Sequence, residues 1–173
     1  EHLEITEPIT QDGMIAFCQD TLHHNTVKAI LSTKKREIID ELIQKQASLF
    51  PDGHEKNLVH ADFDPANIIV QNINGGLEIS GILDWEFSFS GSTLCDVANM
   101  MRYAHHMPKY YEHGFIKGLT SGGYYLPDNW RAKTAMLNLL SLLDCLQRSD
   151  PENRPNQVSD IDKLIDHILK TLR

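Results

Sequence analysis

The sequence predicts a mainly helical α+β fold that carries one small β-hairpin near its middle. Apolar residues recur at helical spacing before residue 51 and after residue 94, whereas two short β-branched and aliphatic runs flank Asn74-Gly75. Hydrophobic residues make up 41% and charged residues 23% of the chain, as in soluble globular proteins. Because 173 residues are the length of one ordinary domain, we expect a single domain over residues 1–173.

Two helices are expected ahead of the hairpin. Residues 12–24 mix apolar and polar positions, and Asp12 is the expected N-cap of this first helix. The second helix is expected over residues 33–50, because its pattern is amphipathic and because Pro51 and Gly53 follow it. Its apolar positions are Ile38, Ile39, Leu42, Ile43, Ala47 and Phe50.

The hairpin itself is indicated by its turn. Residues 67–71 and 77–83 should form the two strands, because Asn74 and Gly75 both tolerate the positive φ angles of a tight turn. After the hairpin the pattern becomes helical and stays so to the end of the chain. Helices are expected over residues 94–105, 108–118, 127–148 and 157–172.

The charge balance disfavours one class of partner. With a formal net charge of -8, the chain lacks the clustered Lys and Arg that neutralise phosphates, so we expect no nucleic-acid partner. An acidic surface suits cationic substrates, or simply solubility, and the sign of the charge does not separate these two. No apolar run reaches the roughly 18 residues that span a bilayer, so no membrane partner is expected either.

The cysteines indicate a reducing environment. Cys18, Cys95 and Cys145 are odd in number and widely spaced, which predicts neither a disulfide framework nor a zinc site. We therefore expect a cytoplasmic protein. Because the sequence begins at Glu1 and not with methionine, we also expect it to be part of a longer chain.

Polar residues with matched spacing lie on both strands of the predicted hairpin. His60 and Asp62 precede the first strand, Asn67 begins it, and Asp84 closes the second strand. Because the start of one hairpin strand lies beside the end of the other, Asn67 and Asp84 should be neighbours, with Asp62 in reach. The five-residue step from Asp62 to Asn67 is also the spacing of the protein-kinase catalytic loop.

Phosphoryl transfer requires this combination of groups. A carboxylate orients the attacking hydroxyl and accepts its proton, and oxygen ligands hold the Mg²⁺ that bridges the nucleotide phosphates. Asp62 suits the first role, and Asn67 and Asp84 suit the second. A turn or capping function for each of the three residues is the alternative.

The segments LVHADFDPANIIV, ISGILDWEFSFSG and LCDVA, over about residues 58–98, resemble the aminoglycoside phosphotransferase family. These enzymes are relatives of the protein kinases and include choline- and homoserine-type kinases. The resemblance implies the C-terminal lobe of a protein-kinase-like fold, with the hairpin carrying the catalytic loop. It further implies ATP-dependent phosphorylation of a hydroxyl on a small molecule such as an aminoglycoside or an amino-alcohol.

The resemblance also implies roles for five residues. Asp62 would be the catalytic base, while Asn67 and Asp84 would bind Mg²⁺ and, through it, the ATP co-substrate. His60 would brace the loop without reacting, and Asp96 would anchor the loop through its backbone. Asp64 and Ser92-Thr93 depart from the usual family pattern. Asp64 adds a carboxylate that could contact substrate or metal, and Glu86 is either a helper at the site or an exposed acid.

The nucleotide-binding half of a kinase is expected to be absent from this chain. Before His60 there is no Gly-rich loop and no strand lysine of the V-A-I-K type, both of which hold the phosphates in kinases. The N-terminal lobe of the same parent protein is thus an expected partner, and the isolated chain is expected to be inactive. Without that lobe, we expect an apolar surface near the chain start and the hairpin, and self-association through it.

The same residues are open to two other functions. A non-catalytic kinase-like binding module would retain the loop for structural reasons, although it would often lose one of the three polar residues. A metal-dependent hydrolase would need further histidine or carboxylate ligands at suitable spacing. The pairs His23-His24 and His105-His106 lack an obvious third ligand, and the aromatic residues between Tyr110 and Trp130 fit core packing at least as well as ligand stacking.

Overall fold

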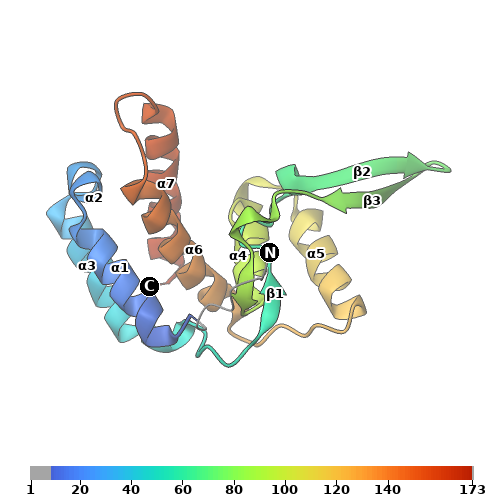
Figure 1. Ribbon diagram of the computed structural model, residues 1–173, viewed down its shortest axis with the longest axis horizontal. Coiled ribbons are helices and arrows are strands. Elements are labelled where there is room, and N and C mark those ends of the chain that lie inside the picture. The colour runs from blue at the N-terminus through green and yellow to red at the C-terminus, as the bar shows by residue number, and fades with distance from the viewer. Residues whose placement is uncertain (1–8, 173) are drawn as a thin grey trace, which may run out of the picture.

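Helices from both ends of the chain share one core. The structure, a computed structural model, describes residues 9–172. Helices α1 (Gln11–His23), α2 (Asn25–Ile30) and α3 (Thr33–Lys45) lie against α6 (Trp130–Gln147) and α7 (Pro155–Thr171) (Figure 1). Fully buried side chains of this core include Cys18, Ile39, Ile43, Leu139, Leu143, Leu146 and Ile165.

Polar contacts also join the two ends. Lys35 of α3 places its Nζ 2.6 Å from Asp162 and 2.7 Å from Asp166, both on α7. The Gln46 side chain donates a hydrogen bond of 2.7 Å to the backbone carbonyl of Leu172. The helices before residue 57 and those after residue 126 therefore pack together, and the segment between these residues connects them.

The N-terminal helices differ in detail from the sequence prediction. The N-cap of α1 is Thr10, whose hydroxyl accepts a hydrogen bond from Gly13 N at 3.1 Å, so the expected Asp12 cap is wrong and Asp12 lies in the first turn. The second predicted helix ends at Lys45, and a separate 3₁₀ turn, η1 (Ala47–Leu49), follows it. Gln46 leaves the helical conformation where its side chain bonds to the end of α7. The short helix α2 was not predicted.

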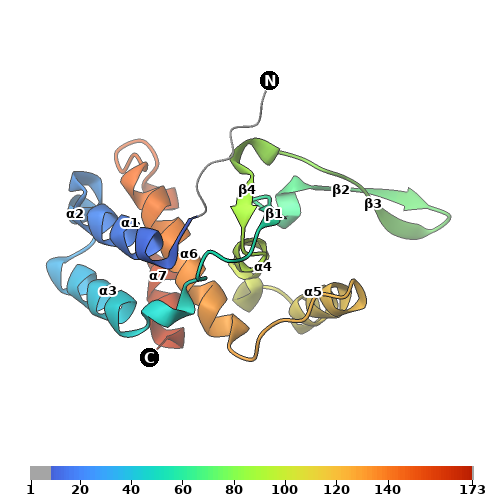
Figure 2. The same ribbon diagram turned by 60° about the horizontal axis from the view of Figure 1, so that its bottom comes forward.

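The middle of the chain forms two small antiparallel sheets. The predicted hairpin is present as β2 (Ile68–Ile73) and β3 (Gly76–Ile82), with Ile68 opposite Ile82. Asn74 and Gly75 have φ angles of 53° and 86°, as the turn prediction required. The hairpin extends away from the core of α1, α2, α3, α6 and α7 (Figures 1 and 2). A second pair, β1 (Asn57–Val59) with β4 (Phe89–Gly91), was missed because strands this short carry no readable alternation.

The remaining helices follow the second sheet. The helix expected over residues 94–105 is divided into α4 (Leu94–Met101) and the 3₁₀ turn η4 (Ala104–His106). Helix α5 (Lys109–Ser121) lies on the same side of the molecule as the hairpin (Figure 2). None of the helices in residues 9–172 combines the length and the apolar character that a bilayer crossing requires.

The cysteines of the described residues are free thiols, and burial raises the pKa of each. Burial raises the pKa of the Cys18 thiol and of the Cys95 thiol to about 12. Both side chains are therefore neutral thiols at physiological pH, and a thiol is a poor nucleophile compared with a thiolate.

Candidate active site

The loop between β1 and β2 is held in place by the imidazole of His60. This side chain is only 2% exposed, and its Nε2 lies 2.7 Å from the backbone carbonyl of Leu83. The backbone N–H of Asp62 donates to Nδ1 at 3.3 Å, so Nδ1 is the acceptor and Nε2 carries the proton that Leu83 accepts. The Trp85 ring lies against the imidazole with centroids 4.5 Å apart. The imidazole thus ties the loop to the segment that follows β3.

Helix α4 fixes the loop from the other side. The Asp96 carboxylate accepts hydrogen bonds from the backbone N–H groups of His60 at 2.9 Å and Ala61 at 3.0 Å. Asn99, one turn further along, donates to the backbone carbonyl of Ala61 at 2.6 Å. Ala61 has a φ angle of 70°, a conformation that costs energy for any residue with a Cβ. Both of its peptide groups are therefore held in this strained geometry by one helix.

Asn99 and Arg102 were not recognised from the sequence. The Asn99 carbonyl oxygen accepts a hydrogen bond of 2.6 Å from Arg102, whose guanidinium also donates to Asn138 and to Ser141 of α6. Asp96, Asn99 and Arg102 follow one another at three-residue intervals, which places them on one face of a helix. The three-residue spacing from Asp96 could therefore have indicated Asn99 and Arg102 in the sequence.

Asp62 and Asn67 are joined directly. The Asn67 side-chain amide donates to the backbone carbonyl of Asp62 at 2.8 Å and to its carboxylate Oδ2 at 3.0 Å. Both partners are acceptors, so the amide orientation is fixed and the Asn67 carbonyl oxygen faces elsewhere. Both side chains are half-buried, and the 3₁₀ turn η2 (Pro65–Asn67), which Asp64 caps, brings them together.

Asp84 stands beside Asn67 through backbone pairing. The N–H of Leu83 donates to the Asn67 carbonyl at 2.9 Å, which continues the ladder in which Ile68 faces Ile82. Asp84 adopts the left-handed conformation, with φ of 67° and ψ of 55°, and begins the 3₁₀ turn η3 (Trp85–Phe87). Its carboxylate is exposed and makes no hydrogen bond to another residue within 9–172. The three residues predicted from the sequence thus come from adjoining segments.

The oxygen atoms left free define what the site can hold. Within the described residues, the Asn67 carbonyl oxygen, one Asp62 carboxylate oxygen and the Asp84 carboxylate have no protein donor. Uncharged amide and carboxylate oxygens are the ligands that Mg²⁺ prefers. In the same range, no group of three or more His, Cys, Asp and Glu side chains is close enough together to hold a metal.

The aromatic residues after the loop divide into buried and exposed. Trp130 is 8% exposed and belongs to the helical core, whereas Tyr110 and Tyr125 are each about three-quarters exposed at 75% and 76%. Tyr111 is half-buried and donates its hydroxyl to the Met100 carbonyl at 2.8 Å. Burial raises the pKa of Tyr111, and the Asp64 carboxylate adds to the shift.

Solved structures of aminoglycoside phosphotransferase APH(4)-Ia have the same fold as this chain. A thermostable mutant in ternary complex with ADP and hygromycin B is 17% identical, with a TM-score of 0.65 over 92% of this chain and 51% of that chain. Another, in complex with AMP-PNP and hygromycin B, is 19% identical with the same TM-score and coverage. The apo form of a thermostable mutant is 18% identical, with a TM-score of 0.62 over 93% and 52% of the two chains.

This chain therefore spans about half the length of these structures. None of the curated proteins compared with it shows a significant match. Residues 17–132, more than half of the chain, match the model of the phosphotransferase enzyme family (APH). The kinase-like fold class and the resemblance inferred from the loop motifs are confirmed. The chain belongs to the APH family of phosphotransferase enzymes.

Proposed function

We propose that this chain forms the acceptor-side half of an ATP-dependent phosphotransferase that acts on a hydroxyl group of a small molecule. The observation that carries the proposal is the hydrogen bond from Asn67 to the Asp62 carboxylate, in a loop fixed by Asp96. A carboxylate held in one orientation beside an amide oxygen is what phosphoryl transfer needs, because catalysis of this reaction is mostly positioning and charge stabilisation. Family membership supports the same reaction class.

Asp62 would act as the base. Asn67 binds one of its carboxylate oxygens, Oδ2, so the other oxygen is available to the acceptor hydroxyl. As the hydroxyl oxygen bonds to the γ-phosphorus of ATP, the bond from that phosphorus to the leaving oxygen of ADP breaks. The hydroxyl proton passes to the Asp62 carboxylate, so charge and atoms balance.

Asn67 and Asp84 would hold the magnesium ion. Their free oxygens lie on adjoining segments, and the exposed Asp84 carboxylate has no competing partner within the described residues. When bound, Mg²⁺ neutralises charge on the nucleotide phosphates. The protein's part is to keep these oxygens in place, which the Leu83 to Asn67 backbone bond and the Asp62 to Asn67 pair do.

The remaining half of the enzyme would supply the nucleotide cradle. The chain covers 51% of the APH(4)-Ia structures, and no Gly-rich loop or strand lysine precedes His60. The hairpin exposes large apolar side chains, with Leu77 at 75%, Ile79 at 66% and Val70 at 53% exposure. We assign this surface to contact with the N-terminal lobe of the parent protein, with residues 1–173 as one C-terminal domain.

The acceptor class follows from charge and from the structural neighbours. Asp64 and Glu86 add carboxylates close to the loop, in a chain of net charge -8. An acceptor bearing amines would neutralise them, and the APH(4)-Ia structures hold hygromycin B together with a nucleotide. An amino-sugar or an amino-alcohol is therefore the proposed substrate.

The deciding experiment measures ATP turnover by the full-length parent protein with a panel of amino-sugars and amino-alcohols. We expect acceptor-dependent release of ADP, and no phosphotransfer by residues 1–173 alone. Binding of panel members by the parent without turnover of any of them would instead favour the non-catalytic module. Turnover by the isolated chain would refute the proposal that the N-terminal lobe supplies the nucleotide-binding elements.

A further inference from the structure

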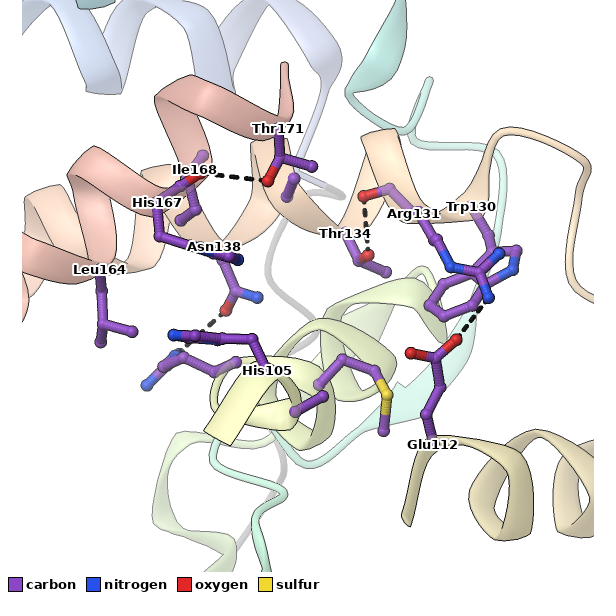
Figure 3. Close-up of a pocket in the computed structure, with 14 residues that line it drawn as sticks. His105, Glu112, Trp130, Arg131, Thr134, Asn138, Leu164, His167, Ile168 and Thr171 are labelled. Atoms are coloured by element: carbon purple, nitrogen blue, oxygen red, sulfur yellow. Dashed lines mark hydrogen bonds and ion pairs between the residues drawn. The ribbon is translucent and has the colours of Figure 1, made fainter. Parts of the chain in front are cut away.

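A cavity lies at the C-terminal end of α4, next to η4. It has a volume of about 220 Å³, is lined by the end of α4, η4, α5, α6 and α7, and opens to solvent beside the exposed His105, His167 and Thr171 (Figure 3). None of residues 60–67 lines it, so it is separate from the site described above. The volume is below the roughly 300–1,000 Å³ of pockets that take drug-sized ligands, which favours a much smaller occupant.

The cavity lining is basic in an acidic protein. Its cationic and titratable side chains are Arg102, Arg131, His105 and His167, and its single carboxylate is Glu112. The chain as a whole carries a net charge of -8, so the charge of this lining is opposite in sign to that of the whole chain. Arg131 is neutralised locally, because it pairs with Glu112 and stacks 4.4 Å above the Trp130 ring.

Arg102 has no such counter-charge. Within the described residues no carboxylate lies at ion-pair distance, and the guanidinium donates only to the neutral oxygens of Asn99, Asn138 and Ser141. These bonds use Nε and Nη2, which leaves Nη1 with two N–H groups. No buried side-chain nitrogen in this range lacks a partner, so Nη1 of the half-buried Arg102 must be accessible from outside the protein. A guanidinium with two free N–H groups is suited to bind an oxyanion.

Two histidines stand at the same cavity. The rings of His105 and His167 are stacked, with centroids 3.9 Å apart and planes at 12°, and both are drawn lining the space in Figure 3. Partial desolvation lowers the pKa of the exposed His105, and the neighbouring His167 and His106 lower it further. An anion bound here would raise the pKa of His105 again, because a negative charge favours the protonated ring.

We propose that this cavity binds a small oxyanion, a phosphate or carboxylate group, through the free N–H groups of Arg102 and ring N–H groups of His105 and His167. A space of about 220 Å³ is too small to enclose a nucleotide or an aminoglycoside, so a small anion fits it better. The basic lining of the cavity favours an anion, whereas the carboxylates of the proposed acceptor site favour a ligand that bears amines.

The test uses the whole 173-residue chain titrated with inorganic phosphate and, separately, with malonate. Chloride at equal ionic strength controls for screening, and amide chemical shifts report binding. We expect saturable shifts at residues 104, 134 and 171 with a Kd on the order of 1 mM, since so small a ligand has few contacts. At tenfold excess over Kd, bound anion should raise the Tm by roughly 3–6 °C. The stronger of the two ligands identifies the oxyanion class.

Matched variants make the result specific. Arg102→Gln should weaken binding at least tenfold, whereas Arg148→Gln, the same change at an exposed arginine of α6, should alter Kd by less than twofold. If Arg102→Gln fails to fold, Thr171→Phe decides, because Thr171 is an exposed cavity residue whose enlargement blocks the space without touching the Arg102 bonds. Absence of saturable shifts with both anions, or equal affinity in wild type and Thr171→Phe, would overturn the proposal.

Discussion

The side-chain amide of Asn67 donates hydrogen bonds to both the backbone carbonyl and the carboxylate of Asp62, at 2.8 and 3.0 Å. One amide thus fixes the position of the loop and the orientation of the acid within it. The arrangement depends on the 3₁₀ turn of residues 65–67, because a fully extended connection would carry Asn67 away from Asp62. Geometry of this kind predicts separable effects on turnover, metal binding and stability.

In the full-length parent, Asp62→Asn should lower kcat by roughly 10²–10⁴, because a general base contributes about that factor. The variant keeps the size of the side chain, so folding and nucleotide affinity should change little. Steady-state kinetics with the best acceptor measure the effect, and Asp20→Asn, an exposed change in α1, is the control. Near-normal turnover by Asp62→Asn would mean that another group accepts the proton.

Asp84→Asn should act on metal binding. The substitution removes the charge of one proposed ligand, so the Mg²⁺ concentration for half-maximal nucleotide binding should rise at least about tenfold. Calorimetric titration of nucleotide at several Mg²⁺ concentrations measures this shift. Asp128→Asn, an exposed change outside the loop, should leave the Mg²⁺ requirement unaltered, and an equal response in the two variants would rule out Asp84 as a ligand.

Asn99→Ala should destabilise the fold by about 1–3 kcal/mol, since it leaves the Ala61 carbonyl and Arg102 without their partner. Asn99 is 8% exposed, so water cannot readily replace its amide. Urea denaturation of residues 1–173 measures the free energy of unfolding. Asn129→Ala, the same change at an exposed position without a capping bond, should cost much less, and equal losses would argue against a special role for Asn99.

Stability should fall as pH decreases from about 7.5 to 5, in part because of His105. The folded state lowers the pKa of His105, so below its ordinary value of 6.5 the unfolded chain binds more protons than the folded chain. The contribution of His105 is therefore complete above that value and is lost as pH falls through the lowered pKa. His105→Gln should flatten the pH dependence of the unfolding free energy, whereas His113→Gln, at an exposed position of α5, should not.

The isolated chain should self-associate through its hairpin. Leu77 and Ile79 are both exposed and, two positions apart, point to the same face of β3. Leu77→Lys combined with Ile79→Lys should shift sedimentation towards the monomer, because charge opposes apolar contact. Glu78→Lys, which alters the other face, should change association less, and unchanged sedimentation of the double variant would place the contact elsewhere.

Features set by local chemistry could be predicted from the sequence. The hairpin was predicted because Asn74 and Gly75 favour the positive φ angles that the turn adopts. The proximity of Asn67 to the end of the second strand followed from hairpin geometry alone, and the Leu83 to Asn67 bond agrees with it.

Features set by distant contacts could not be predicted. Helix α3 ends where Gln46 bonds to Leu172, a partner 126 positions away. The strained φ of Ala61 depends on Asp96 and Asn99, and nothing in the residue type alanine indicates it. The cap of α1 was assigned to Asp12 because aspartate is a good capping residue, but the backbone places Thr10 in that position and Asp12 in the first turn.

The shared core of the two chain ends sets the order of events during synthesis. Lys35 must wait for Asp162, 127 residues later, which at roughly 5–20 residues per second takes a ribosome about 6–25 s. Throughout that interval the apolar faces of α1 and α3 have no α6 or α7 to cover them, so the nascent chain presents a binding surface for chaperones. The loop of residues 60–67 is translated between these helices, and its supports are complete only when α6, which holds Arg102 through Asn138 and Ser141, has left the exit tunnel.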